Sequence, residues 1–303
     1  MLSIRDLTHV YPNGTRALDG VSLDIPAGMF GLLGPNGAGK SSLMRCLATL
    51  QVPTSGQIRF GEIDVLAQPA SLRATLGYLP QDFGVYPRVS AEDMLDHLAV
   101  LKGIAGRGER RETIETLLRQ VNLWDVRKKA IAGFSGGMRQ RFGIAQALIG
   151  NPRLIIVDEP TAGLDPEERN RFNNLLSEIG ESVVVILSTH IVDDVTDLCP
   201  RMAILVGGRI VQTGTPTELI AALQGHVWQA SIEKHELDAV KKAHDLIATR
   251  LRGGRTVIRV LADGSPGVGF TPVDAGLEDV YFATLTRHRQ AEASVAAQPK
   301  KAA

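Results

Sequence analysis

One run of eight residues has the composition of a loop that binds phosphate groups. It reads Gly34-Pro35-Asn36-Gly37-Ala38-Gly39-Lys40-Ser41, and Ser42 follows it. Glycines allow backbone N–H groups to turn inward around the α and β phosphates of a nucleotide at the start of a helix. In this G-x-x-x-x-G-K-[ST] pattern we expect Lys40 to reach the β and γ phosphates and Ser41 to bind Mg²⁺. The alternative is a chance glycine turn, but the run lies between an expected strand and an expected helix, as this loop must.

Two adjacent carboxylates follow a second apolar segment. Residues 154–157 are Leu-Ile-Ile-Val, and Asp158 and Glu159 come next. A buried strand tolerates acids at its end where a cation or a reaction needs them. We expect Asp158 to hold Mg²⁺, directly or through water, and Glu159 to orient and deprotonate an attacking water. Helix-capping acids are the alternative, and it weakens beside a phosphate loop.

The pattern of apolar residues predicts the elements that position these groups. Alternation over 2–7 and 21–25, with a turn at Asn13-Gly14, indicates antiparallel strands. Short apolar runs predict strands at 29–33, 76–79, 154–157 and 183–187, amphipathic periods predict helices at 91–101, 110–121 and 166–179, and a hairpin is expected around Gly207-Gly208. The expected fold class is α/β: a P-loop NTPase core with a mainly parallel sheet, an N-terminal antiparallel β subdomain and an α-helical insert over about 84–150.

The chain is long enough for two domains. We place a nucleotide-binding domain at 1–222 and a small α+β domain at 223–288, with a strand at 227–232, a helix at 236–246 and a hairpin around Gly253-Gly254. After Arg289 the composition is Ala, Gln, Lys and Pro without periodicity. Such sequence buries little apolar surface, so we expect 289–303 to be a disordered tail.

Composition argues against several classes of protein. Lys+Arg and Asp+Glu both number 33 in 303 residues, so the formal net charge is zero and no nucleic-acid partner is expected. The two cysteines, Cys46 and Cys199, lack the spacing of metal ligands. No apolar stretch approaches the roughly 18 residues of a membrane span, and residues 1–13 do not resemble a signal peptide. A cytoplasmic protein is expected.

A third motif, Phe134-Ser135-Gly136-Gly137-Met138, makes the prediction more specific. Ser135 can cap a following helix, and the two glycines allow backbone N–H groups to approach an anion. The motif resembles the signature of the ATP-binding cassette (ABC) family, Leu-Ser-Gly-Gly-Gln. Ser135, Gly136 and Gly137 match that pattern, whereas Phe134 and Met138 depart from it. Alone, the motif would more often be only a helix cap; its place ahead of Asp158 makes it specific.

The resemblance covers about residues 1–222 and implies roles for four further side chains. Tyr11 would stack on adenine, Gln81 would contact Mg²⁺ and the attacking water, and His190 would contact the γ phosphate of ATP. Asp165, in Ala162-Gly163-Leu164-Asp165, would contact the opposite subunit of a dimer and also cap the helix that starts at Pro166. Without the resemblance, Tyr11 would be a packing residue, Gln81 a surface glutamine and His190 a structural histidine.

The same resemblance implies an assembly. Two copies of the chain would close head to tail over two ATP molecules, so that the phosphate loop of one copy faces the Ser135 motif of the other. An integral membrane permease encoded separately would receive the motion, which places the chain on the inner face of the cell membrane. Residues 135–141, Ser-Gly-Gly-Met-Arg-Gln-Arg, together with residues 277–282 resemble subunits of the ABC-2-type export branch. Alternatives are a soluble ABC ATPase acting on nucleic acid or ribosomes, which usually has two cassettes or a long coiled-coil insert, and a regulatory module, which is expected to lack the acid present here as Glu159.

Overall fold

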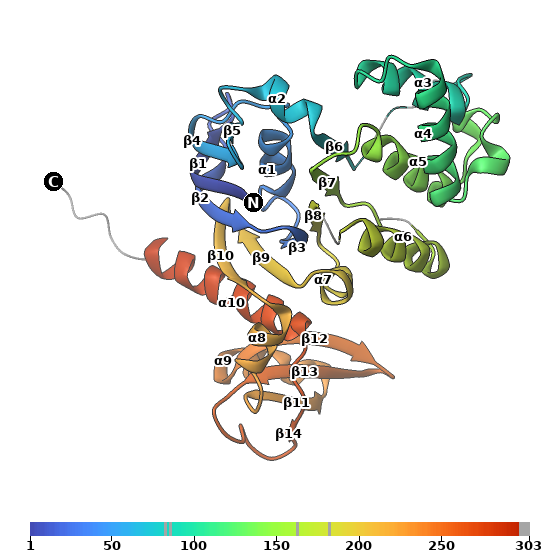
Figure 1. Cartoon of the computed structure of the whole chain (residues 1–303). Coiled ribbons are helices and arrows are strands. Elements are labelled where there is room, and N and C mark those ends of the chain that lie inside the picture. The colour runs from blue at the N-terminus through green and yellow to red at the C-terminus, as the bar shows by residue number, and fades with distance from the viewer. Residues whose placement is uncertain (82–83, 85–86, 162–163, 181–182, 297–303) are drawn as a thin grey trace. The chain divides into compact units, whose positions relative to one another are not determined.

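The computed structural model describes residues 1–81, 84, 87–161, 164–180 and 183–296 (Figure 1). The chain divides into two compact units, Met1–Ile210 and Val211–Ala303. This division falls before the boundary near 222 that we expected. The reason is that the segment after Ile210 packs within the second unit: the Thr284 hydroxyl donates to the Gln212 side chain (2.5 Å), and helix α8 contacts helix α10.

The first unit begins with an antiparallel sheet in the strand order β2-β1-β4-β5. Its strands are β1 (Leu2–Val10), β2 (Arg16–Ile25), β4 (Ser55–Phe60) and β5 (Ile63–Asp64). The expected pairing of β1 with β2 is confirmed, and the alternating residues Leu2, Ile4 and Leu7 are fully buried. These side chains share one core with residues of α1 (Lys40–Leu47), β3, β7 and β8, so α1 is held on both sides by apolar contacts.

A second sheet of six strands has the order β10-β9-β3-β8-β7-β6. Its strands are β3 (Gly28–Leu33), β6 (Leu76–Leu79), β7 (Leu154–Asp158), β8 (Val184–Thr189), β9 (Arg201–Val206) and β10 (Arg209–Gly214). The pairs from β9 through β3, β8 and β7 to β6 are all parallel. Because the carboxyl ends of parallel strands meet at one edge, the phosphate loop, Gln81, Glu159 and His190 follow neighbouring strands there. The expected α/β class is confirmed.

Three helices form the expected insert. They are α3 (Ala91–Leu101), α4 (Arg107–Gln120) and α5 (Gly136–Leu148), joined by the 3₁₀ turns Trp124–Val126 and Ile131–Gly133 and grouped together in Figure 1. Helix α5 packs closely on β6, where a Cβ on Gly77 would lie 2.2 Å from the Ala147 carbonyl oxygen. A glycine is therefore required at the point where α5 crosses the sheet.

Three further helices of this unit are α2 (Pro69–Ala74), α6 (Pro166–Ile179) and α7 (Val192–Leu198). Asp165 caps α6 as expected, since its Oδ1 accepts from the Glu168 backbone N–H (2.9 Å). The Glu168 side chain lies 3.5 Å from Arg141 and 3.8 Å from Arg171.

The second unit is a small α+β structure. It contains a sheet in the order β12-β13-β11-β14, built from Asp245–Arg252, Arg255–Leu261, Val227–Ile232 and Thr271–Pro272, together with α8 (Pro216–Ala221), a 3₁₀ turn (Lys234–Glu236), α9 (Leu237–Ala243) and α10 (Leu277–Ala296). The hairpin at Gly253-Gly254 is present, whereas the expected helix over 236–246 ends at Ala243 and Leu246 belongs to β12.

The end of the chain differs from our expectation. We expected disorder from 289, but residues 289–296 continue α10. Alanine, glutamine and glutamate are good helix formers, so the lack of apolar periodicity did not prevent a helix there. The rest of the expected tail, 297–303, lies outside the described residues. In the part of the chain that the structure describes, no helix is both long and apolar enough to cross a membrane.

Candidate nucleotide-binding site

The phosphate loop leads directly into the N-terminus of α1. Gly39 precedes the helix with φ 105°, a left-handed conformation that favours glycine, and a Cβ there would lie 2.3 Å from the Ala17 carbonyl oxygen. No side chain caps the helix at this point. The N–H groups of its first turn therefore face the loop without a side-chain acceptor, which is the arrangement that binds an anion.

Lys40 is buried at the base of this loop. Only 5% of the residue is exposed, and its ammonium group donates to the carbonyl oxygen of Gly34 (2.7 Å). The same Nζ lies 3.4 Å from Oε1 of Glu159. The lysine charge is thus fixed between the loop and the carboxylate at the end of β7, where the terminal phosphates of a nucleotide would lie.

Asp158 ends strand β7 as a buried carboxylate. It is 3% exposed, and its Oδ1 has no hydrogen-bond partner among the described residues. Burial raises the pKa of the Asp158 carboxyl; the Ser188 and Ser41 hydroxyls oppose this shift and the Glu159 charge adds to it. A buried carboxylate oxygen without a partner beside the Ser41 hydroxyl fits a magnesium ion, which prefers oxygen ligands.

Glu159 lies at the centre of the polar contacts. Its backbone has φ 49°, uncommon for a residue other than glycine, and its N–H donates to the Ser188 carbonyl oxygen (2.8 Å). Its Oε2 accepts from the Gln81 side-chain amide (3.4 Å) and lies 3.3 Å from Nδ1 of His190. With Lys40 on Oε1, the structure brings together three predicted site residues around this one carboxylate.

Lys40, Gln81 and Glu159 border a cavity of about 560 Å³, here called the nucleotide cavity. It is lined by Tyr11, Thr15, Arg16, Ala17, Pro35, Asn36, Gly37, Gly39, Lys40, Ser41, Ser42, Gln81, Glu159, Gly207 and Gly208. Tyr11, for which we predicted stacking on adenine, lines the cavity, and its hydroxyl lies 3.0 Å from the Ser42 hydroxyl. The 15–17 segment and the glycine pair were not predicted. No local motif marks them; they reach the loop because β2 and the β9–β10 turn fold beside it, with the Gly208 N–H bound to the Ala38 carbonyl (2.9 Å).

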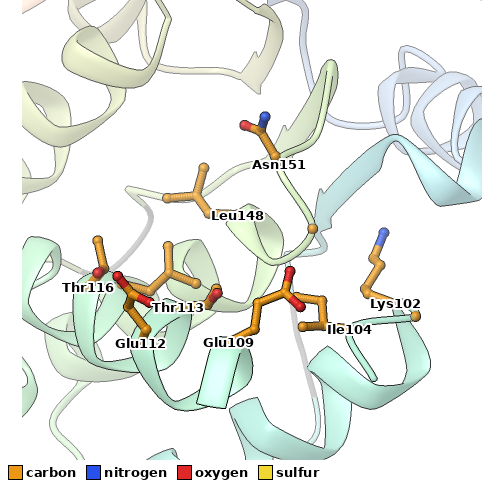
Figure 2. Close-up of a pocket in the computed structure, with 11 residues that line it drawn as sticks. Lys102, Ile104, Glu109, Glu112, Thr113, Thr116, Leu148 and Asn151 are labelled. Atoms are coloured by element: carbon orange, nitrogen blue, oxygen red, sulfur yellow. The ribbon is translucent and has the colours of Figure 1, made fainter. Parts of the chain in front are cut away.

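Another cavity, of about 630 Å³, lies between α4, the loop after α3 and the end of α5 (Figure 2). Glu109 and Glu112 border it, so it has acids where a nucleotide would need donors. Its lysine, Lys102, donates to the carbonyl oxygens of Arg73 and Leu76 (2.8 and 2.7 Å), and burial lowers its pKa. None of the predicted site residues lines this cavity.

Eight predicted site residues do not line the nucleotide cavity. Gly34, Ala38 and Asp158 each adjoin a lining residue in the sequence, and His190 contacts Glu159. The remaining four are Ser135, Gly136, Gly137 and Asp165. Ser135 accepts from the Met138 N–H (3.2 Å) and caps α5, and both Ser135 and Gly136 are exposed. At Gly137 a Cβ would lie 2.5 Å from the Glu168 carboxylate, so this glycine also serves the packing of α5 on α6. Ala162 and Gly163, in the predicted loop before Asp165, lie outside the described residues.

Comparison with known proteins agrees with this geometry. The family model described as ABC transporter matches residues 18–162. The daunorubicin/doxorubicin resistance ATP-binding protein DrrA of Streptomyces peucetius is 34% identical over 275 residues, 90% of this chain and 79% of that protein. The methionine import ATP-binding protein MetN 3 of Pseudomonas fluorescens is 36% identical over 247 residues, 78% of this chain and 75% of that protein.

Solved structures lead to the same family. The ATP-binding cassette MJ0796, in a dimeric post-hydrolysis state bound to ADP and Pi, matches with a TM-score of 0.66 and 26% identity, over 71% of this chain and 98% of that one. The phosphate loop, the paired acids at the end of β7 and these relatives agree. The chain belongs to the ABC transporter family, as an ATP-binding subunit.

Proposed function

We propose that this chain hydrolyses ATP with Mg²⁺ in a head-to-tail homodimer, and that closure of the dimer drives export through a separately encoded integral membrane permease. The observation that supports hydrolysis most strongly is the set of contacts to Glu159. Lys40, Gln81 and His190 all lie within 3.4 Å of its carboxylate, at the sheet edge where the phosphate loop ends. A carboxylate held in this way can orient a water and accept its proton.

The groups around Glu159 divide the chemistry between them. The backbone N–H groups of Gly34 and residues 36–39 and the Lys40 ammonium bind the phosphates, and His190 donates toward the γ phosphate. Ser41, Asp158 and Gln81 would hold Mg²⁺, which supplies positive charge to the β and γ oxygens when bound. Tyr11, at the cavity wall, offers its ring to adenine.

The exposed Ser135 motif supports a shared site. In one chain Ser135 and Gly136 do not reach the nucleotide cavity, although the N-terminus of α5 is suited to an anion. A second copy placed head to tail would bring its Ser135 motif to the γ phosphate and its Asp165 to the interface. MJ0796, solved as a dimer bound to ADP and Pi, is a precedent for the association of two cassettes.

The extent of the similarity supports export as the direction of transport. The match to DrrA, named for drug resistance, covers 90% of this chain and so continues into the second unit. The match to MetN 3, named for methionine import, covers 78%. We therefore propose export, with the chain at the cytoplasmic face of the membrane where ATP is supplied.

Replacement of Lys40 by alanine tests the nucleotide site. Lys40→Ala removes a point charge from the phosphates, so we expect ATP binding to weaken and phosphate release from Mg-ATP to fall. Mg-ATP at 100 times its Kd stabilises a protein by about 2.7 kcal/mol, so the thermal midpoint of wild type should rise and that of Lys40→Ala should not. The control is Lys241→Ala, an exposed lysine of the second unit that should behave as wild type. An equal rise in midpoint for Lys40→Ala and wild type would overturn the assignment.

A further inference from the structure

Asp194 is a fully buried carboxylate outside the residues assigned so far. It is 0% exposed and lies in the first turn of α7. Its Oδ2 accepts a short hydrogen bond from the Thr161 hydroxyl (2.6 Å) and a longer one from the Thr189 hydroxyl (3.4 Å), and its Oδ1 accepts from Nε of Arg169 (2.8 Å). A buried carboxylate is costly unless it is paired, and here three donors from three segments share it.

Each donor adjoins a residue of the proposed mechanism. Thr161 follows Glu159 by two positions, and Thr189 immediately precedes His190. The backbone N–H of Ile191 donates to the Thr189 hydroxyl (3.0 Å), which fixes the fold of the loop that contains His190. Arg169 lies in α6, where its backbone N–H donates to the backbone carbonyl oxygen of Asp165 (2.9 Å). The Asp194 carboxylate therefore connects the segments that contain Glu159, His190 and Asp165.

Glu159 depends on such anchors because its backbone is strained. Its φ of 49° costs free energy for a residue with a side chain and persists only where neighbouring contacts fix it. The Glu159 N–H bond to Ser188 fixes the chain on one side, and the Thr161 hydroxyl on Asp194 fixes it on the other. Loss of either anchor would let the carboxylate move away from the attacking water.

We propose that Asp194 is a positioning residue, which fixes the positions of Glu159 and His190 relative to the Asp165 segment. In this way it couples the contact between Asp165 and the second copy to hydrolysis. This inference rests on the proposed function. Asp194 does not touch substrate; it acts through Thr161, Thr189 and Arg169.

The sharpest test changes Thr161 and leaves the carboxylate in place. Thr161→Val removes the hydroxyl at nearly constant volume, and Thr161→Ser restores it. Because a small misplacement of a catalytic group can cost about 10²-fold, we expect Thr161→Val to lower kcat by about 10- to 100-fold. The Kd for ATP should stay within about twofold, and Thr161→Ser should recover most of the rate. Thr75→Val, which removes a hydroxyl bound to the Leu72 carbonyl (3.1 Å), is the matched control and should keep kcat.

A double-mutant cycle separates positioning from a merely structural role. If Thr161 acts through Glu159, then Thr161→Val should cause no further loss in the Glu159→Gln background. Equal fold-losses in both backgrounds, or a lower thermal midpoint with unchanged kcat, would overturn the inference. Should Thr161→Val fail to fold, Arg169→Gln replaces it as the test variant, because the Arg169 side chain is 26% exposed and its loss disturbs the core less. We expect the same loss of kcat and the same Kd for ATP from Arg169→Gln. A wild-type chain that binds ATP yet never hydrolyses it, even with its membrane partner, would instead contradict the proposed function.

Discussion

Asp158 shows how one side chain of the candidate site affects the stability of the fold. Its carboxyl is buried, burial raises its pKa above the ordinary value of 3.8, and one oxygen has no partner among the described residues. The folded chain therefore holds the proton more tightly than the unfolded chain does. The resulting contribution to stability is complete below pH 3.8 and is lost as the pH rises through the raised folded pKa.

Asp158→Asn, which cannot titrate, tests this directly. Without nucleotide and with a chelator present, we expect the thermal midpoint of Asp158→Asn to exceed that of wild type at neutral pH, because the buried charge is gone. The difference should shrink as the pH falls toward 3.8. The same variant should lose Mg-dependent phosphate release. An Asn variant that is less stable than wild type at neutral pH would show that the carboxylate is compensated in the nucleotide-free chain.

The residues of the candidate site differ in how far they could be predicted from the sequence. Lys40, Asp158 and Glu159 could be found because their chemistry depends on adjacent positions: a loop of fixed length, or two acids after an apolar run. Gln81 and His190 needed a family resemblance, and the structure places both against Glu159. Asp194 was not predicted. In the sequence it is one of two acids in a helical first turn, and its partners Thr161 and Arg169 approach it only when α6 and α7 fold together.

Among the helices, α5 connects fold and function most directly. Its N-terminus is capped by Ser135, and Gly77 lets its C-terminal half lie against β6. Met138, which departs from the family pattern, is partly buried in the first turn, and its backbone N–H rather than its side chain bonds Ser135. The proposed phosphate contacts come from Ser135 and the glycines, not from position 138.

Two substitutions at this helix start should therefore differ. Met138→Gln should keep ATPase activity within about tenfold, or about 1.4 kcal/mol in barrier. Ser135→Arg should nearly abolish phosphate release, because a bulky side chain would occupy the place of the partner's γ phosphate. Thr215→Ala removes the cap of α8, at a cost of about 1 kcal/mol, and controls for the loss of a cap alone. Equal effects of the changes at 135 and 138 on turnover would refute this view of the motif.

Periodicity predicted most elements because their buried faces are regular. Helix α6 begins and ends where the amphipathic pattern predicted, at Pro166 and Ile179. The prediction was wrong at two helix ends, where strand pairing or helix propensity outweighs the hydrophobic pattern. Helix α9 stops at Ala243 because the residues that follow pair with β13. Helix α10 continues to Ala296 because its last residues are good helix formers. Neither outcome follows from local hydrophobicity, since one depends on a partner strand and the other needs no apolar face.

The assembled protein is proposed to work as two chains with two shared sites. Each chain has a phosphate loop, a proposed base and a Ser135 motif, but the motif does not line its own nucleotide cavity. A second copy is the simplest source of the missing contact, and ATP bound between the copies would hold them together. Hydrolysis at Glu159 would release them.

Glu159→Gln separates ATP binding from hydrolysis and tests this assembly. Glutamine keeps the size of glutamate but cannot accept the proton of the attacking water, and loss of a general base costs about 10² to 10⁴ in rate. The phosphate loop and Asp158 remain, so ATP should still bind and the closed dimer should accumulate.

Size-exclusion chromatography with light scattering measures this dimer directly. We expect the Glu159→Gln chain to elute as a dimer with Mg-ATP and as a monomer with ADP, while wild type with Mg-ATP gives the dimer only briefly. The measurement is made on the isolated chain and on its complex with the copurified membrane subunit. A Glu159→Gln chain that binds ATP in both settings, yet never shows an ATP-dependent association of its two copies, would contradict the shared-site mechanism.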